Sequence, residues 1–113
     1  MDSEKRSKIK QLARQIKKNP SDSFSKFALA LEFQKQEEYK NARILFEDIL
    51  ESDPDYVGVY YHLGKLYELR NRLEDARKMY KRGIPKAKEQ DKKRTQSELE
   101  EALFNVEIEI EEQ

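Results

Sequence analysis

The chain resembles itself when it is shifted so that Pro20 falls on Pro54. In this alignment small residues meet small residues, and aromatic residues meet aromatic residues. Self-similarity with a fixed period of about 34 residues is typical of helical repeats, in which a unit of two helices is copied along the chain. The paired positions are Pro20/Pro54, Leu29/Leu63, Ala30/Gly64, Phe33/Tyr67, Tyr39/Leu73, Ala42/Ala76, Phe46/Tyr80 and Leu50/Ile84.

The residues in these positions resemble the pattern of the tetratricopeptide repeat (TPR) family. The second unit reads Tyr60-x-x-Leu63-Gly64-x-x-Tyr67 and then Ala76-x-x-x-Tyr80, with Tyr60 where the family prefers tryptophan. The first unit reads Lys26-x-x-Leu29-Ala30-x-x-Phe33, then Ala42-x-x-x-Phe46 and Pro54. Lys26 departs from the pattern, because a large aromatic residue is usual there, and its neighbour Phe27 can partly compensate. Lys88 replaces the closing proline of the second unit, although Pro85 lies shortly before it.

The resemblance implies an all-α fold: an antiparallel helix-pair solenoid with two full repeats and a capping helix at each end. Small residues in both units would let helix backbones approach closely. No unit can bury its apolar stripe alone, so neighbouring units must stack. We predict one domain over residues 1–113, with an N-terminal helix at 2–18, repeats at 22–55 and 56–89, and a C-terminal helix at 92–111. Within the repeats we expect helices near 22–36, 39–52, 56–70 and 73–84.

The N-terminal segment has the pattern of a second helix whose first helix is missing. In the register of the repeat, its Leu12 and Ile16 fall on Phe46 and Leu50 of the first unit. Pro20 then ends the segment, and Ser21, Asp22 or Ser23 can cap the next helix. The apolar face predicted for this segment consists of Ile9, Leu12, Ala13 and Ile16.

Pro85 is the residue least compatible with a helix in the second repeat. A proline inside a helix removes one backbone hydrogen bond and costs about 3 kcal/mol. We therefore expect the chain to kink or end its helix at Gly83-Ile84-Pro85. A last helix would then begin at Asp91 or Thr95, since Thr95-x-x-Glu98 fits a capping box.

The C-terminal segment has a broad apolar face, which leaves two alternatives open. It can cap the second repeat, or it can dock elsewhere, including on a second chain. Its stripe consists of Leu99, Ala102, Leu103, Val106 and Ile110, and Phe104 and Ile108 widen it.

Charge and composition exclude several classes of protein. Lys and Arg number 23 and Asp and Glu also number 23, so the net charge is zero and no nucleic-acid partner is expected. The chain has no cysteine, which excludes disulfides and thiolate metal sites. No stretch is apolar for long enough to suggest a membrane partner or a signal peptide. We expect a soluble, cytoplasmic protein.

The sequence offers no catalytic, cofactor-binding or metal-binding constellation. His62 is the single histidine, and the three glycines are scattered. Paired-carboxylate catalysis requires two acids that converge in a pocket, whereas the seven glutamates at 98–112 have the pattern of a solvated acidic face. We predict that the protein is not an enzyme and needs no cofactor.

The resemblance also implies where a partner would bind, because the first helix of each TPR unit lines a concave groove. Carried over to this chain, the partner-binding positions are Phe24, Phe27, Leu31 and Gln34 in the first unit and Gly58, Tyr61, Lys65 and Glu68 in the second. Phe24, Phe27 and Leu31 would form one helix stripe. This stripe is either core beneath residues 2–18 or an exposed anchor for a helix or extended segment.

The main functional prediction is a protein-protein interaction module or scaffold that binds a peptide or helix of unknown identity in its groove. Phe27 and Leu31 stand where TPR proteins that bind acidic chaperone tails place Lys and Asn, so such an adaptor is not expected. The alternative is a self-associating structural element, a homo-oligomer without a separate ligand. Residues 1–18 carry seven Lys or Arg and two acids, and residues 95–113 carry seven glutamates and no Lys or Arg. These ends could attract each other between copies.

Overall fold

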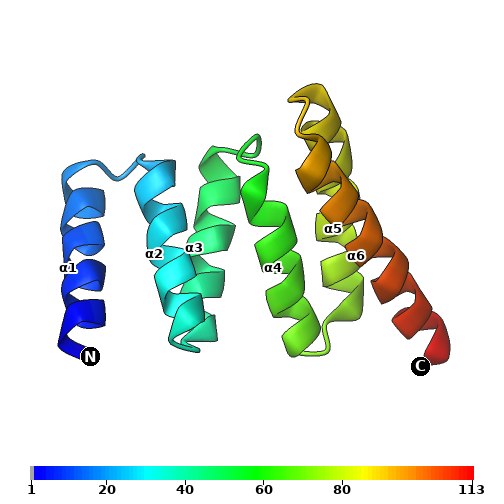
Figure 1. The fold of residues 1–113 in the computed structure, drawn as a ribbon, viewed down its shortest axis with the longest axis horizontal. Coiled ribbons are helices and arrows are strands. Elements are labelled where there is room, and N and C mark those ends of the chain that lie inside the picture. Colours follow the sequence, from blue (N-terminus) through cyan, green and yellow to red (C-terminus); the bar gives the residue numbers. More distant parts are fainter. Residues whose placement is uncertain (1) are drawn as a thin grey trace. The chain divides into compact units, whose positions relative to one another are not determined.

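A computed structural model describes residues 2–113, except for the side chains of Asp2 and Lys5, and this part of the chain forms six helices and no strand. The all-α, TPR-like fold class predicted from the sequence is confirmed. Figure 1 shows the helices in chain order. They are α1 (Asp2–Lys18), α2 (Ser23–Lys35), α3 (Tyr39–Ser52), α4 (Gly58–Leu69), α5 (Leu73–Glu89) and α6 (Lys93–Glu112).

The contacts between helices gather in two compact units. The first extends to Tyr56 and contains α1, α2 and α3, while the second runs from Val57 to Gln113 and contains α4, α5 and α6. In the first unit α2 packs against α3, and α1 packs against α2. In the second unit α5 packs against both α4 and α6, and α4 also contacts α6. The unit boundary falls in the turn that follows Pro54, between the two repeats.

The core of the first unit lies between α2 and α3. Lys26 takes the place of the usual aromatic residue at its edge: its side chain is only 11% exposed, and its Nζ lies 2.7 Å from Oδ2 of Asp48 on α3. The Phe27 ring packs 5.8 Å from the Phe46 ring, measured between centroids. Phe27 therefore compensates for the missing aromatic, as the sequence suggested. The buried apolar side chains between these helices are Leu29, Ala30, Ala42, Phe46 and Ile49.

The core of the second unit depends on two glycines that lie directly against side chains of neighbouring helices. A Cβ added at Gly64 of α4 would lie 2.7 Å from Cζ of Tyr80 on α5. A Cβ added at Gly83 of α5 would lie 2.7 Å from Cβ of Tyr60 and 2.9 Å from Cδ1 of Leu99. Such contacts are too short for carbon atoms, so only glycine fits there. Full burial of each large apolar side chain in this layer contributes about 1.5–3 kcal/mol.

Three turns close through residues in the left-handed backbone region. Glu37, Asn71 and Asp91 have φ angles of 59°, 57° and 55°. The next residue in each turn donates its N–H to a carbonyl near the end of the preceding helix, as in Glu38 to Phe33 at 2.8 Å. These bonds satisfy carbonyls at the ends of α2, α4 and α5, in the manner of Schellman motifs.

Asp22 is the residue that caps α2. Its carboxylate accepts hydrogen bonds from the Ser25 hydroxyl at 2.6 Å and from the Ser25 backbone N–H at 3.0 Å. Both bonds favour the ionised form and hold the pKa of Asp22 below its usual value. The sequence offered Ser21, Asp22 and Ser23 as capping residues, and Asp22 is the N-cap in the structure.

Of the two alternatives at Gly83-Ile84-Pro85, a kink or a helix end, the helix end is wrong. The helix continues through Pro85 to Glu89. Pro85 is exposed, whereas Gly83 and Ala87 on either side of it are buried. Because these two neighbours are packed in the core, the helix continues although Pro85 cannot donate a backbone hydrogen bond.

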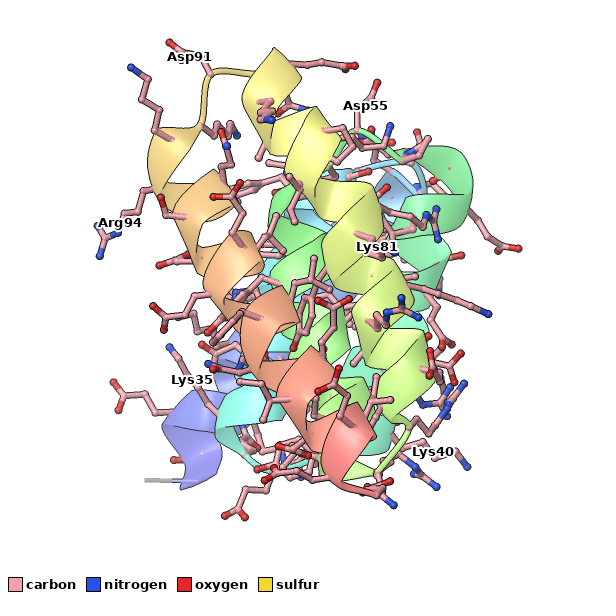
Figure 2. All side chains as sticks on the ribbon, turned by 90° about the vertical axis from the view of Figure 1, so that its right-hand side faces the viewer. Lys35, Lys40, Asp55, Lys81, Asp91 and Arg94 are labelled. Carbon is pink, nitrogen blue, oxygen red and sulfur yellow. The ribbon has the colours of Figure 1, made fainter. Side chains whose placement is uncertain are left out.

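The cap predicted for the last helix is also wrong. The N-cap residue of α6 is Lys92, without a side-chain hydrogen bond, and Thr95 lies inside the helix. Asp91 lies in the turn between α5 and α6, and Figure 2 shows it at the top of the view. In α1, Ile9 is buried but Ala13 is exposed, so the apolar face is narrower than predicted.

The described helices include none with the length and apolar character required to cross a membrane.

Candidate functional site

The predicted residues of the first unit lie on α2 but do not form one exposed stripe. Phe24 is 71% exposed. The Phe27 ring turns inward, with its centroid 5.2 Å from that of Tyr56 and in contact with Phe46. Leu31 and Gln34 are half-buried. Phe27 is therefore a packing residue of the first unit, and Phe24 is the apolar side chain that this part of α2 leaves to solvent.

Two ion pairs connect α1 to the rest of the first unit, one to Glu32 of α2 and one to Glu38, the N-cap residue of α3. Nζ of Lys8 lies 3.0 Å from Oε1 of Glu32, and a guanidinium nitrogen of Arg6 lies 3.3 Å from Oε2 of Glu38. The bond from Lys8 lowers the pKa of Glu32, although the burial of this carboxylate opposes the shift. Ile9 is buried beside these pairs. This helix leaves Phe24 uncovered.

The predicted residues of the second unit form a connected group along α4. Nζ of Lys65 lies 5.5 Å from the Tyr61 ring centroid and 3.8 Å from Oε2 of Glu68. The Tyr80 hydroxyl donates a hydrogen bond to the Glu68 carboxylate. Burial, together with this bond, raises the pKa of Tyr80. Glu68 therefore takes part in the contact between α4 and α5. Tyr61 and Lys65 are half-buried at the surface.

Tyr61 and Lys65 form one wall of an open pocket of about 230 Å³. The other wall belongs to α6, which lies against α4 in the same unit. Two cations, Lys65 and Arg94, and two carboxylates, Glu98 and Glu101, surround the pocket. Figure 2 shows Arg94 extending outward from α6. The α6 residues that line the pocket are Arg94, Ser97, Glu98, Glu101, Ala102 and Asn105.

The sequence analysis missed the α6 wall of this pocket. It interpreted Glu98 and Glu101 as part of a solvated acidic face. The repeat contained a usable signal, because the register that lays Pro20 on Pro54 also lays Tyr60 on Arg94, at the start of α6. The last helix therefore occupies the place of the first helix of a further repeat, and such helices line the predicted groove.

His62 follows the pocket residue Tyr61 on α4. Burial lowers the pKa of His62, and the nearby Glu98 carboxylate opposes the shift. The Tyr61 ring lies edge-on to the imidazole, with 5.7 Å between centroids. Among residues 2–113, no group of three or more His, Asp or Glu side chains is arranged to hold a metal ion.

Comparison with known proteins assigns the family. A sequence model of the tetratricopeptide repeat matches residues 33–94, which is more than half of the chain. The chain belongs to the tetratricopeptide repeat family. TPR domains are generally non-enzymatic protein-interaction modules. A search of curated proteins gives no match.

Several solved structures are similar to this chain. A tetratricopeptide repeat domain protein from Salinibacter ruber is 46% identical, with a TM-score of 0.74, and the match covers 76% of this chain and 97% of that one. The TPR2B domain of yeast Sti1, solved as a complex with pHsp70, is 17% identical with a TM-score of 0.84 over 96% of this chain and 86% of that one. The Sgt2 TPR domain from Aspergillus fumigatus is 17% identical with a TM-score of 0.81, covering 98% and 71% of the two chains. The last two likenesses concern the fold alone.

Proposed function

We propose that this protein binds a segment of a partner protein at the pocket between α4 and α6, with Tyr61 and Lys65 as contact residues. The observation that carries the proposal is the convergence of these two predicted side chains with Arg94 on one open pocket. In TPR structures, the first helices of successive units supply such contacts, and α4 and α6 hold these places here.

The size of the pocket favours a peptide over a small molecule. Sites that enclose a drug-sized ligand have volumes of about 300–1,000 Å³. The present pocket is smaller and open, so it fits one or two side chains of a segment that lies along the surface. Lys65 and Arg94 can pair with an acidic or amide side chain, while Glu98 and Glu101 favour a basic residue nearby.

Binding would then depend on a mixed pattern of charges in the partner. This differs from the capture of an acidic tail, for which several cations without competing carboxylates would be needed. Phe24 of the first unit is a separate candidate for an apolar contact, because it is the most exposed of the large hydrophobic side chains on the described residues. An exposed aromatic residue is a frequent anchor in protein interfaces.

The test is selection of peptides from a random display library on the wild-type chain, followed by affinity measurements on the enriched peptides. The double substitution Lys65→Ala/Arg94→Ala should weaken binding at least about tenfold, which corresponds to about 1.4 kcal/mol. Lys81→Ala is the matched control, because Lys81 is an exposed lysine on α5 outside the pocket (Figure 2).

Circular dichroism of each variant verifies that the helices remain intact. If Lys65→Ala/Arg94→Ala binds the selected peptides as tightly as the wild type, the pocket is not the binding site. If Phe24→Ala alone removes binding, the site lies on the first unit instead.

A further inference from the structure

The face of α6 that points away from α5 carries two exposed apolar side chains. Phe104 is 65% exposed and Ile108 is 41% exposed, although both belong to a regular helix rather than to a loop. They follow i, i+4 spacing and are therefore neighbours on one helix face. The opposite face buries Leu99, Ala102 and Val106 in the second unit. We call Phe104 and Ile108 the α6 outer patch.

Acidic side chains surround the α6 outer patch. Glu100, Glu111 and Glu112 are exposed on the same side of the helix, one turn away from Phe104 or Ile108. The segment 95–113 contains no Lys or Arg that could neutralise them from within α6. An apolar pair with an acidic rim is complementary to a helix with basic side chains, whose methylene groups can cover a ring while their charges meet carboxylates.

The outer face of α1 has this chemistry. Lys10, Arg14 and Lys17 are exposed and follow i, i+4, i+7 spacing, so they form one basic stripe, and Lys18 lies beside it. The inner face holds Ile9, which is buried against α2. The stripe is therefore directed away from the first unit.

We propose that the α6 outer patch of one copy docks α1 of a second copy. Phe104 and Ile108 would lie beneath the stems of Arg14 and Lys17, with Glu100 and Glu111 paired to the basic stripe. The contact is heterologous, which allows open chains of copies. None of these α6 residues lines the pocket between α4 and α6, so the contact can hold or fail independently of the proposed peptide site.

The association should be weak and sensitive to salt. We expect two single helix faces to bury less surface area than a standard protein interface, for which the lower limit is about 1,200 Å². Raising the ionic strength from about 0.1 M to about 1 M shortens the screening length from about 10 Å to about 3 Å. Sedimentation velocity over a concentration series should show oligomers at low salt and a shift toward monomer at high salt.

Variants separate the α6 outer patch from other apolar surface. Phe104→Asp adds a charge at an exposed position and should weaken association at least about tenfold without loss of helicity. Ile44→Asp is the matched control, because Ile44 is 49% exposed on α3 in the first unit and should leave association unchanged.

A charge exchange tests the identity of the docked helix. The variant Lys10→Glu/Arg14→Glu/Lys17→Glu carries an acidic α1, and the variant Glu100→Lys/Glu111→Lys/Glu112→Lys carries a basic α6. Each variant alone should be monomeric, because its α1 and α6 now have like charge. An equimolar mixture should associate again, since each variant supplies the opposite charge to the other.

Three results would overturn the proposal. The first is a wild-type chain that remains monomeric at all concentrations and low salt. The second is association that Phe104→Asp leaves unaffected, and the third is a mixture of the two charge variants that stays monomeric. Capture of a different protein by the α6 outer patch, with the wild type monomeric, would assign the surface to that partner instead.

Discussion

The Tyr80 ring of α5 lies directly against Gly64 of α4. The equivalent pair in the first unit is Ala30 and Phe46, so a Cβ is tolerated there and not here. The hydroxyl of Tyr80 explains the difference, because its hydrogen bond to Glu68 fixes the ring over Gly64. A phenylalanine ring has no such anchor and can shift slightly away from the neighbouring backbone.

This pair gives a prediction for stability. Gly64→Ala should lower the free energy of unfolding by about 1–3 kcal/mol, because overpacking outweighs the helix propensity of about 1 kcal/mol that alanine adds. In the background Tyr80→Phe the same substitution should cost less, since the ring is free to move. Urea denaturation of the four chains of this cycle measures the coupling. Equal costs in both backgrounds would show that the hydroxyl does not hold the ring.

At the scale of the helices, the capping residues are what the sequence reasoning recovered least well. For the N-cap of α2, the sequence left three candidates, Ser21, Asp22 and Ser23, and the structure shows that it is Asp22. Asn71 and Asp91 carried a signal that the sequence analysis did not use, because Asn and Asp enter the left-handed region more readily than other residues with a side chain, whereas Glu37 carried none. Their conformation follows from the closing hydrogen bonds of each turn and from the packing of the helices on either side.

Pro85 shows how packing overrides a local rule. Its ring points to solvent while Gly83 and Ala87 hold α5 against its neighbours. The cost of about 3 kcal/mol for an internal proline is comparable with the burial of one or two large side chains, so a well-packed helix can absorb it.

Replacement of Pro85 should therefore stabilise the protein. Pro85→Ala restores an N–H that can donate to the Lys81 carbonyl, and it should raise the free energy of unfolding by about 1–2 kcal/mol after the greater freedom of the unfolded chain is subtracted. Thermal and urea unfolding measure the change, with Lys81→Ala as a control for the effect of alanine itself on α5. A lower midpoint for Pro85→Ala would mean that the ring makes stabilising contacts.

At the scale of the whole molecule, we propose two different surfaces for other proteins. The pocket of the second unit is lined by charges of both signs, whereas the α6 outer patch is apolar with an acidic rim. Both include residues of α6, but no residue belongs to both.

We expect the two surfaces to act independently. Lys65→Ala/Arg94→Ala should weaken binding of the selected peptides and leave sedimentation unchanged, while Phe104→Asp should do the reverse. Peptide affinity and oligomeric state measured on both variants test this expectation. Loss of both properties in either variant would indicate one shared surface.

The sequence by itself determined the fold class and the family, because a fixed repeat period with small and aromatic residues in register permits little else than stacked helix pairs. It also indicated Tyr61 and Lys65, which the structure places at a pocket, while their binding role remains a prediction. Only the tertiary structure decided that Phe27 turns inward, that α5 passes Pro85, and that α6 supplies the second wall of the pocket. Periodicity records which residues are alike, whereas the direction of a side chain depends on neighbours that are distant in sequence. The last helix shows this most clearly: its glutamates have the composition of a solvated face, and the packing of α6 against α4 places Glu98 and Glu101 at the pocket.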